Sequence, residues 1–226
     1  MGMINAYLIA VDYGYVLIDS GIPNSEKKIG NVLKQNGADF SDIKLIIITH
    51  AHADHAGSAA AVRKLSGAPV LAHEGDLPYF QQEKPMTHCP TGWFGRLFLK
   101  TGRPTTPYGA FTPEILLKGD EGFDLADYGL HGSVVATPGH TEGSVSVTLS
   151  NKSALVSDLV ASGLLLGGIA FRDRAKPPPY EDDAHQVARD LLKLLDMGME
   201  TFYLGHGGPL SARDVRQYCD SIMNKA

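Results

Sequence analysis

The sequence predicts an α/β protein in which helices cover packed β-sheets. Short apolar runs typical of strands occur both early and late in the 226-residue chain, and segments with helical periodicity are interspersed between them. This alternation is typical of layered α/β architectures and not of two separate units. Hydrophobic residues make up 43% and charged residues 20%, which suits a buried core and excludes a disordered chain or a coiled coil. We therefore expect one domain over residues 1–226.

The expected elements follow in order along the chain. A turn at Asp12-Tyr13-Gly14 between two short apolar runs is typical of a β-hairpin. Asn24 is a favourable N-cap, and apolar residues three and four positions apart predict a helix that stops at Gly37. The continuous run KLIII at 44–48 is typical of a buried strand. The remaining expected strands are 69–72, 134–136, 144–149, 153–156 and 201–204, and the remaining expected helices are 58–65, a segment from Ala184 to Gly198, and a C-terminal helix capped by Ser211.

Residues 76–123 are irregular and rich in Pro, Gly, Thr and aromatic residues. The stretch is too long for an ordinary connection and is predicted to be a functional insertion. Trp93 and Phe94 belong to its densest apolar cluster, WFGRLFL, which should not stay exposed on a soluble monomer. Either the segment packs on its own domain or on a second copy in a homodimer, or it forms a lid in which Trp93 and Phe94 contact an apolar part of a substrate.

Composition argues against several partners. The formal net charge is −5 and no basic stripe occurs, which disfavours nucleic acid and anionic membranes. The longest uncharged apolar stretch, 159–171, is too short to span a bilayer, and the N-terminus lacks the basic region of a signal peptide. Cys89 and Cys219 are too few and too far apart for a disulfide scaffold. We expect a cytoplasmic protein.

Ligand-type side chains cluster after the expected strand at 44–48. His50-Ala51-His52-Ala53-Asp54-His55 offers four of them within six residues. If these groups are buried together, they lack hydrogen-bond partners unless they bind a metal ion. The alternative is that they form a polar loop on the surface. His140, Asp158 and His206 also lie just past expected strands. Because strand ends at one sheet edge can converge, the five His and two Asp are enough for two metal ions.

The sequence resembles the metallo-β-lactamase-fold hydrolase superfamily over nearly its whole length. The motifs that carry the resemblance are NAYLI, VLIDSG, THAHADHAGS, TPGHTEGSVSV, the Asp after a strand, and GHGGPL. The resemblance implies a four-layer αββα sandwich with a dinuclear site at the edge where the two sheets meet. By motif position it also implies one metal ion on His50, His52 and His140, a second on Asp54, His55 and His206, and Asp158 as the bridge between them.

The chemistry expected of such a site is hydrolysis. Two divalent ions that share a water lower its pKa toward about 7, which supplies a hydroxide for attack on a carbonyl or phosphoryl centre. Asp54 is expected to be a ligand that also orients this nucleophile. Zinc is the default ion, although imidazole and carboxylate ligands also suit iron or manganese. Asp19, in the IDSG motif, stands where the superfamily has an Asp that supports the metal ligands. It is equally suited to form hydrogen bonds within its own turn.

The substrate class is narrowed by differences from known subgroups. Glyoxalase II enzymes share THAHADH-type motifs, but we do not expect their glutathione-recognising C-terminal extension after His206. Lactonases carry a Tyr that assists catalysis where this chain has Ala161. A small-molecule ester, thioester or lactone is therefore the expected substrate. A phosphodiesterase and a non-catalytic metal-binding sensor remain as alternatives.

Overall fold

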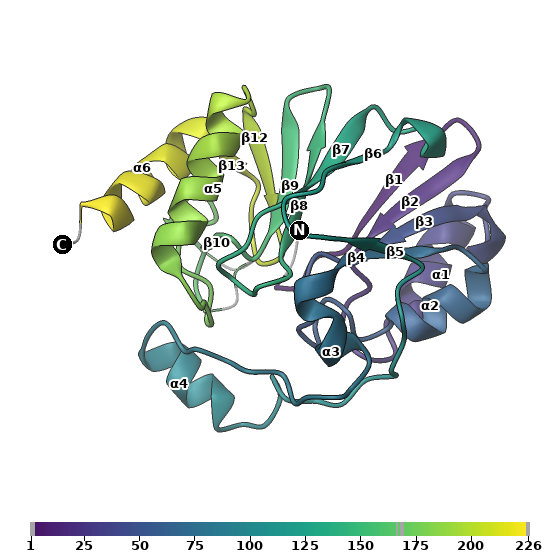
Figure 1. Ribbon diagram of the computed structural model, residues 1–226, viewed down its shortest axis with the longest axis horizontal. Coiled ribbons are helices and arrows are strands. Elements are labelled where there is room, and N and C mark those ends of the chain that lie inside the picture. The colour runs from purple at the N-terminus through teal and green to yellow at the C-terminus, as the bar shows by residue number, and fades with distance from the viewer. Residues whose placement is uncertain (1–2, 166, 168–169, 225–226) are drawn as a thin grey trace.

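The computed structural model describes residues 3–165, 167 and 170–224 (Figure 1). Two β-sheets pack face to face, and helices cover their outer faces, so the four-layer αββα sandwich in a single domain is confirmed. The first sheet has the order β1-β2-β3-β4-β5, in which β1 and β2 form the predicted hairpin and the later neighbours are parallel. Its strands are β1 (Tyr7–Val11), β2 (Gly14–Ile18), β3 (Ile43–Ile47), β4 (Val70–His73) and β5 (Ile115–Leu117).

The second sheet has the order β13-β12-β9-β8-β7-β6. Its strands β9 and β12 are parallel, and the other neighbouring pairs are antiparallel. The strands are β6 (Phe123–Asp124), β7 (Gly132–Ala136), β8 (Val145–Leu149), β9 (Ser153–Ser157), β12 (Thr201–Leu204) and β13 (Leu210–Ser211). A separate short pair is formed by β10 (Ala161–Ser162) and β11 (Ala175–Lys176).

The helices divide between the two outer faces. The first sheet carries α1 (Glu26–Gln35), α2 (Ala59–Ser66) and α3 (Leu77–Phe80), whose apolar faces share one core cluster with that sheet. The second sheet carries α5 (Ala184–Asp196) and α6 (Ala212–Met223), which share another. The teal helix α4 (Trp93–Leu99) stands away from both sheets in Figure 1.

Strand β3 explains why the KLIII run is apolar at successive positions. Leu45 and Ile47 point into the core between the two sheets. Ile46, together with Ile48 just past the strand, points into the core beneath the helices. Because successive side chains alternate between faces and both faces are buried, a continuous apolar run is required here.

Two local expectations need correction. Asn24 is not the N-cap of α1, because it adopts a left-handed φ of 71° in the turn before the helix, and Ser25 takes the N-cap position. Asn tolerates this conformation better than most residues, which accounts for its place in the turn. The irregular segment 76–123 also contains β5, an edge strand that pairs with β4. Its three residues are too short a run to be recognised from periodicity.

The residues just before helix α4 pair with the stretch 178–181 through backbone groups. The amide N of Thr91 donates to the carbonyl O of Pro179 at 3.0 Å, and Pro90 pairs with Tyr180 in an isolated bridge. A Cβ atom on Gly95 would lie 2.2 Å from that same carbonyl O of Pro179, far inside contact distance. Glycine at position 95 therefore sets how closely the helix approaches the stretch.

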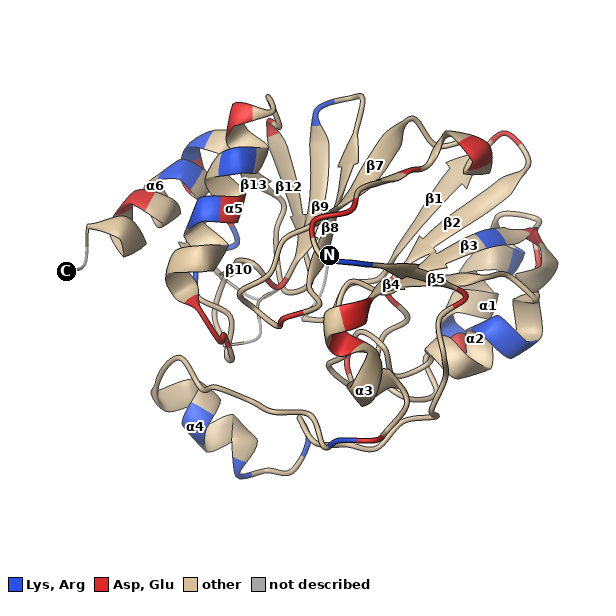
Figure 2. Cartoon of the chain, in the orientation of Figure 1, with Lys and Arg blue, Asp and Glu red and all other residues tan. Residues whose placement is uncertain are grey.

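Surface charge is mixed across the outer helices. Figure 2 shows residues of both signs on α5 and on α6. Among the described residues, no helix combines the length and the apolar content that crossing a bilayer requires.

We predict that Gly95→Ala detaches α4, because the added methyl group would collide with the Pro179 backbone. Limited trypsin digestion should then cut faster at Arg96 and Lys100, both exposed, while the rest of the domain stays protected. Gly92→Ser is the matched control, since a Cβ at position 92 meets nothing within 4 Å and Ser is a favourable N-cap. Equal cleavage rates in Gly95→Ala and the parent would contradict this account of the docking.

Candidate metal centre

The ligand-type side chains all follow strands of the sandwich and meet at one edge of the two sheets. The His50–His55 loop follows β3 in the first sheet. In the second sheet, His140 comes after β7, Asp158 directly after β9, and His206 soon after β12. Parallel strand order at β3 and β9–β12 brings these ends together, as the sequence predicts.

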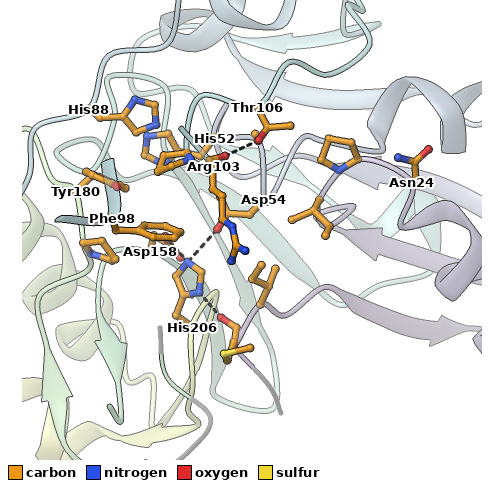
Figure 3. Close-up of a pocket in the computed structure, with 17 residues that line it drawn as sticks. Asn24, His52, Asp54, His88, Phe98, Arg103, Thr106, Asp158, Tyr180 and His206 are labelled. Atoms are coloured by element: carbon orange, nitrogen blue, oxygen red, sulfur yellow. Dashed lines mark hydrogen bonds and ion pairs between the residues drawn. The ribbon is translucent and has the colours of Figure 1, made fainter. Parts of the chain in front are cut away.

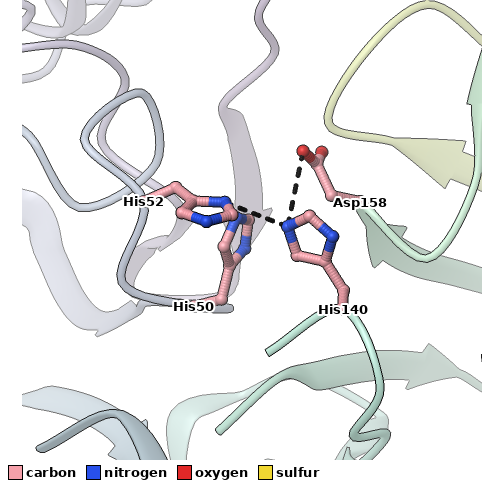
Figure 4. Close-up of side chains that lie close together, drawn as sticks. All are labelled: His50, His52, His140 and Asp158. Carbon is pink, nitrogen blue, oxygen red and sulfur yellow. Dashed lines mark hydrogen bonds and ion pairs between the residues drawn. The ribbon is translucent and has the colours of Figure 1, made fainter. Parts of the chain in front are cut away.

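The first group of donors consists of His50, His52, His140 and Asp158 (Figure 4). The Nδ1 atom of His52 lies 3.1 Å from Nε2 of His50 and 3.0 Å from Nε2 of His140. Burial lowers the pKa of both His50 and His52 well below its usual range, and neighbouring imidazoles lower it further. The rings are therefore neutral, and each keeps a lone pair that can bind a metal ion.

The second group consists of Asp54, His55 and His206. Nε2 of His206 lies 3.3 Å from Oδ2 of Asp54, and Nε2 of His55 lies 3.9 Å from the same oxygen. The carboxylate of Asp158 contacts this group too, at 3.2 Å from Nε2 of His206 and 3.4 Å from Nε2 of His55. Asp158 therefore lies between the two groups, where the resemblance places a bridging residue.

Unpaired buried atoms indicate that these donors fit a cation. Nε2 of His55 and Oδ1 of Asp158 are buried and have no hydrogen-bond partner. Buried polar atoms rarely stay unpaired, and these two face each other across the space between the groups. Burial alone would lower the pKa of His206, but the carboxylates of Asp158 and Asp54 raise it to about 10. The edge thus attracts positive charge, and its imidazole and carboxylate donors suit Zn²⁺, Fe or Mn²⁺.

Asp19 supports His55 from behind. Its Oδ2 lies 2.8 Å from Nδ1 of His55, and its Oδ1 accepts from the amide N of Thr49 at 2.9 Å. The hydroxyl of Ser157, at the end of β9, also donates to Asp19 at 3.2 Å. A ring that donates its Nδ1 hydrogen to a carboxylate presents Nε2 to the metal site. Of the two roles that the sequence left open, the contacts favour support of the ligands.

Asp76 is a second supporting carboxylate, and sequence reasoning missed it. Its Oδ2 accepts from the amide N of Ala51 at 2.8 Å and from the hydroxyl of Thr141 at 2.9 Å, and its Oδ1 accepts from the amide N of Gly143 at 3.0 Å. Ala51 separates His50 from His52, and Thr141 follows His140. One fully buried carboxylate therefore joins the two loops that carry the first group of donors. Burial raises its pKa to about 6.

A cavity of about 450 Å³ opens over the metal-binding edge (Figure 3). Asp54, the most exposed carboxylate of the edge, faces it together with Asp158 and His206. Phe98 from α4 lines it together with Pro179, Tyr180 and His88, and Ile4, Ile22 and Pro23 line it as well. His88, which the sequence left outside the motifs, stacks on His52 with ring centroids 4.8 Å apart.

The predicted substrate contacts of Trp93 and Phe94 are not found at this cavity. Phe98 lines the cavity, and the ring of Phe94 stacks on that of Phe98 with ring centroids 5.7 Å apart. Trp93 does not line the cavity and is 71% exposed. The apolar cluster is a helix, and the close approach of Gly95 to Pro179 decides which helix face turns inward. Composition alone does not reveal that face.

Comparison with known proteins agrees with this geometry. Residues 1–206 match the sequence model of the metallo-beta-lactamase superfamily. The chain belongs to this superfamily. It is 26% identical to the probable metallo-hydrolase YflN of Bacillus subtilis, over 98% of this chain and 87% of that protein. It is 24% identical to the metallo-beta-lactamase fold-containing protein ST1585 of Sulfurisphaera tokodaii, over 93% of this chain and 75% of that protein.

A solved structure of the same superfamily confirms the fold. The metallo-beta-lactamase family protein TTHA1429 from Thermus thermophilus superposes with a TM-score of 0.68 at 24% identity. The alignment covers 97% of this chain and 73% of the other. The superfamily resemblance and the fold class expected from the sequence are therefore both confirmed, and the His/Asp cluster lies at the sandwich edge of a metallo-hydrolase-like fold.

We predict that Asp76→Ala weakens metal binding by roughly 10–100-fold, the usual cost of losing a partner that orients ligands. Metal affinity should be measured by chelator competition, alongside the thermal midpoint. Asp76→Asn should fall between the parent and Asp76→Ala, because the amide keeps one acceptor oxygen. A lower thermal midpoint with unchanged metal affinity would restrict Asp76 to a role in folding.

We predict a loss of similar size, roughly 10–100-fold in metal affinity, for Asp19→Ala, because His55 would lose the carboxylate that orients its ring. Asp12→Ala, an exposed change in the β1–β2 turn, is the matched control and should bind metal like the parent. Normal metal affinity in Asp19→Ala would leave Asp19 with a role in its turn alone.

Proposed function

We propose that this protein is a dinuclear metal-dependent hydrolase that cleaves an ester, thioester or lactone bond in a small molecule. The observation that carries the proposal is Asp158, a buried carboxylate that contacts donors of both groups beneath an apolar cavity. Membership of the superfamily and the names of its relatives as probable metallo-hydrolases support a hydrolytic role.

The donor sets divide naturally between two ions, for which Zn²⁺ is the first expectation and Fe or Mn²⁺ the alternatives. His50, His52 and His140 would hold one ion, Asp54, His55 and His206 would hold the other, and Asp158 would bridge them. Bound ions would polarise the scissile carbonyl group and activate a water molecule. Asp54 also faces the cavity, so its carboxylate is placed to accept a hydrogen bond from the attacking water and orient it.

The reaction balances as a simple hydrolysis. The water oxygen forms a bond to the carbonyl carbon, and the bond from that carbon to the leaving oxygen or sulfur breaks. One water proton ends on the leaving alcohol or thiol, and the other product is a carboxylic acid. No external oxidant, reductant or group donor is needed.

The cavity wall favours a carboxyl ester over a phosphodiester. Arg103 is the only Lys or Arg among the described residues that line it, and about half of the other lining residues are apolar. A phosphodiester carries a permanent negative charge and is usually recognised by several cationic or N–H donors. The uncharged carbonyl substrates are a better match for this wall.

We predict that metal-reconstituted protein approaches two equivalents of metal and hydrolyses p-nitrophenyl carboxyl esters, with activity lost on chelation. Asp158→Ala should lower metal content and reduce kcat/KM by more than the roughly 10–100-fold expected for an orienting residue. Elemental analysis and steady-state rates measure both quantities.

Several results would overturn parts of this proposal. A firm value of one equivalent, unchanged in Asp54→Ala, would exclude the dinuclear site. Faster turnover of bis-(p-nitrophenyl)phosphate than of carboxyl esters would indicate a phosphodiesterase instead. Metal binding without turnover of esters, thioesters, lactones or phosphodiesters would indicate a sensor domain.

A further inference from the structure

A second cavity adjoins the one over the metal-binding edge. Its volume is about 420 Å³, and it shares Ile4 and Ile22 with the first cavity. In Figure 3 Asn24 lies on the side of the first cavity opposite Phe98 and Tyr180, and Ile22, which lines both cavities, precedes Asn24 by two positions. The two cavities are therefore neighbours that meet at an apolar pair of side chains.

The second cavity is a groove between α1 and the β1–β2 hairpin. Ser25, Lys28, Ile29 and Val32 of the α1 region line one side. These positions follow a spacing of three and four, so they lie along one helix face and extend over about 10 Å. Ala6, Leu8 and Leu17 line the other side. Through Ile4 and Ile22 the groove borders the cavity over the metal-binding edge.

The groove lining suits a hydrocarbon chain. Lys28 is the only charged side chain among the described residues that line it. The hydroxyl of Ser20 already donates to the carbonyl O of His55 at 2.8 Å, so it is not free to bind a polar ligand. Ile22 and Val32, both large apolar residues, are each 44% exposed along the groove. Covering this apolar surface would be favourable for any chain that fills the groove.

We propose that this groove binds the alkyl chain of the substrate, so that the enzyme acts on acyl compounds with a medium or long chain. This inference rests on the hydrolase function proposed above. With the carbonyl group at the metal-binding edge, the chain passes between Ile4 and Ile22 and lies against α1. The two lining residues that the groove shares with the metal cavity favour a substrate chain over a second protein copy as the occupant.

The test compares p-nitrophenyl esters from acetate through butyrate, hexanoate and octanoate to decanoate. In the parent, kcat/KM should rise with chain length, by at most about 4-fold for each buried CH₂ group. Ala6→Trp places a large side chain in the groove and should lower the decanoate-to-acetate ratio of kcat/KM at least 10-fold. Ala10→Trp is the matched control, because Ala10 is an exposed residue of β1 outside the groove lining, and it should keep the parent ratio.

A second variant and a binding measurement keep the groove separate from the catalytic proposal. Val32→Glu puts a charge on the exposed helix side of the groove and should also lower the ratio. Calorimetry with n-decanol and metal-free protein should detect binding in the parent and in Ala10→Trp, and its loss in Ala6→Trp. Decanol binding without hydrolysis of any ester would keep the groove and reject the hydrolase function.

Other outcomes would reject the groove. If the chain-length dependence is absent, or is unchanged in both Ala6→Trp and Val32→Glu, the alkyl chain does not bind there. If these variants instead change the oligomeric state in size-exclusion chromatography with the ratio unchanged, the groove is a contact between two copies of the chain.

Discussion

A buried carboxylate needs positive charge or hydrogen-bond donors around it, and at Asp158 this requirement organises the metal-binding edge. Its side chain is only 4% exposed, and its carboxylate lies within 4 Å of imidazole nitrogens of His55, His140 and His206. Two of these histidines come from the second sheet and one from the first. The pKa of Asp158 is held well below its usual range because His206 and His55 outweigh the effect of burial. Histidines that follow strands of both sheets therefore contact the same negatively charged carboxylate, at the edge where the two sheets meet.

Two further carboxylates hold the loops around that centre. Asp19 hydrogen-bonds to the ring of His55 and to the amide N of Thr49, which lies just before the His50–His55 loop. Asp76 ties the same loop to the turn after His140. Both carboxylates are buried, and each accepts hydrogen bonds from groups in separate chain segments. They therefore restrict the positions of the ligand side chains, although neither belongs to the two donor groups. Such outer partners fix the ring orientations that a metal site needs.

The features that could be predicted from the sequence depend on the type of side chain and lie next to a strand that is easily recognised. The density of ligands in His50–His55 and the positions of Asp158 and His206 just past strands were enough to place the donor set. Asp76 was not predicted as a supporting residue because two of its three hydrogen-bond partners are backbone amides, which leave no pattern in the sequence. The cavity wall was also missed, since Phe98 and Tyr180 come from distant segments that only the folded chain brings together. Trp93 and Phe94 were chosen by composition, and composition says nothing about the direction of a helix face.

The attachment of α4 has a consequence for how this protein can change over generations. The residues just before the helix pair with the stretch 178–181 through main-chain atoms, and within the helix an added Cβ at Gly95 would collide with that stretch. Main-chain hydrogen bonds are available to almost any sequence, so this part of the attachment does not depend on which side chains α4 carries. One of them, Phe98, forms part of the cavity wall. Substitutions in α4 can therefore reshape the cavity wall while the ligand side chains of the metal-binding edge stay unchanged.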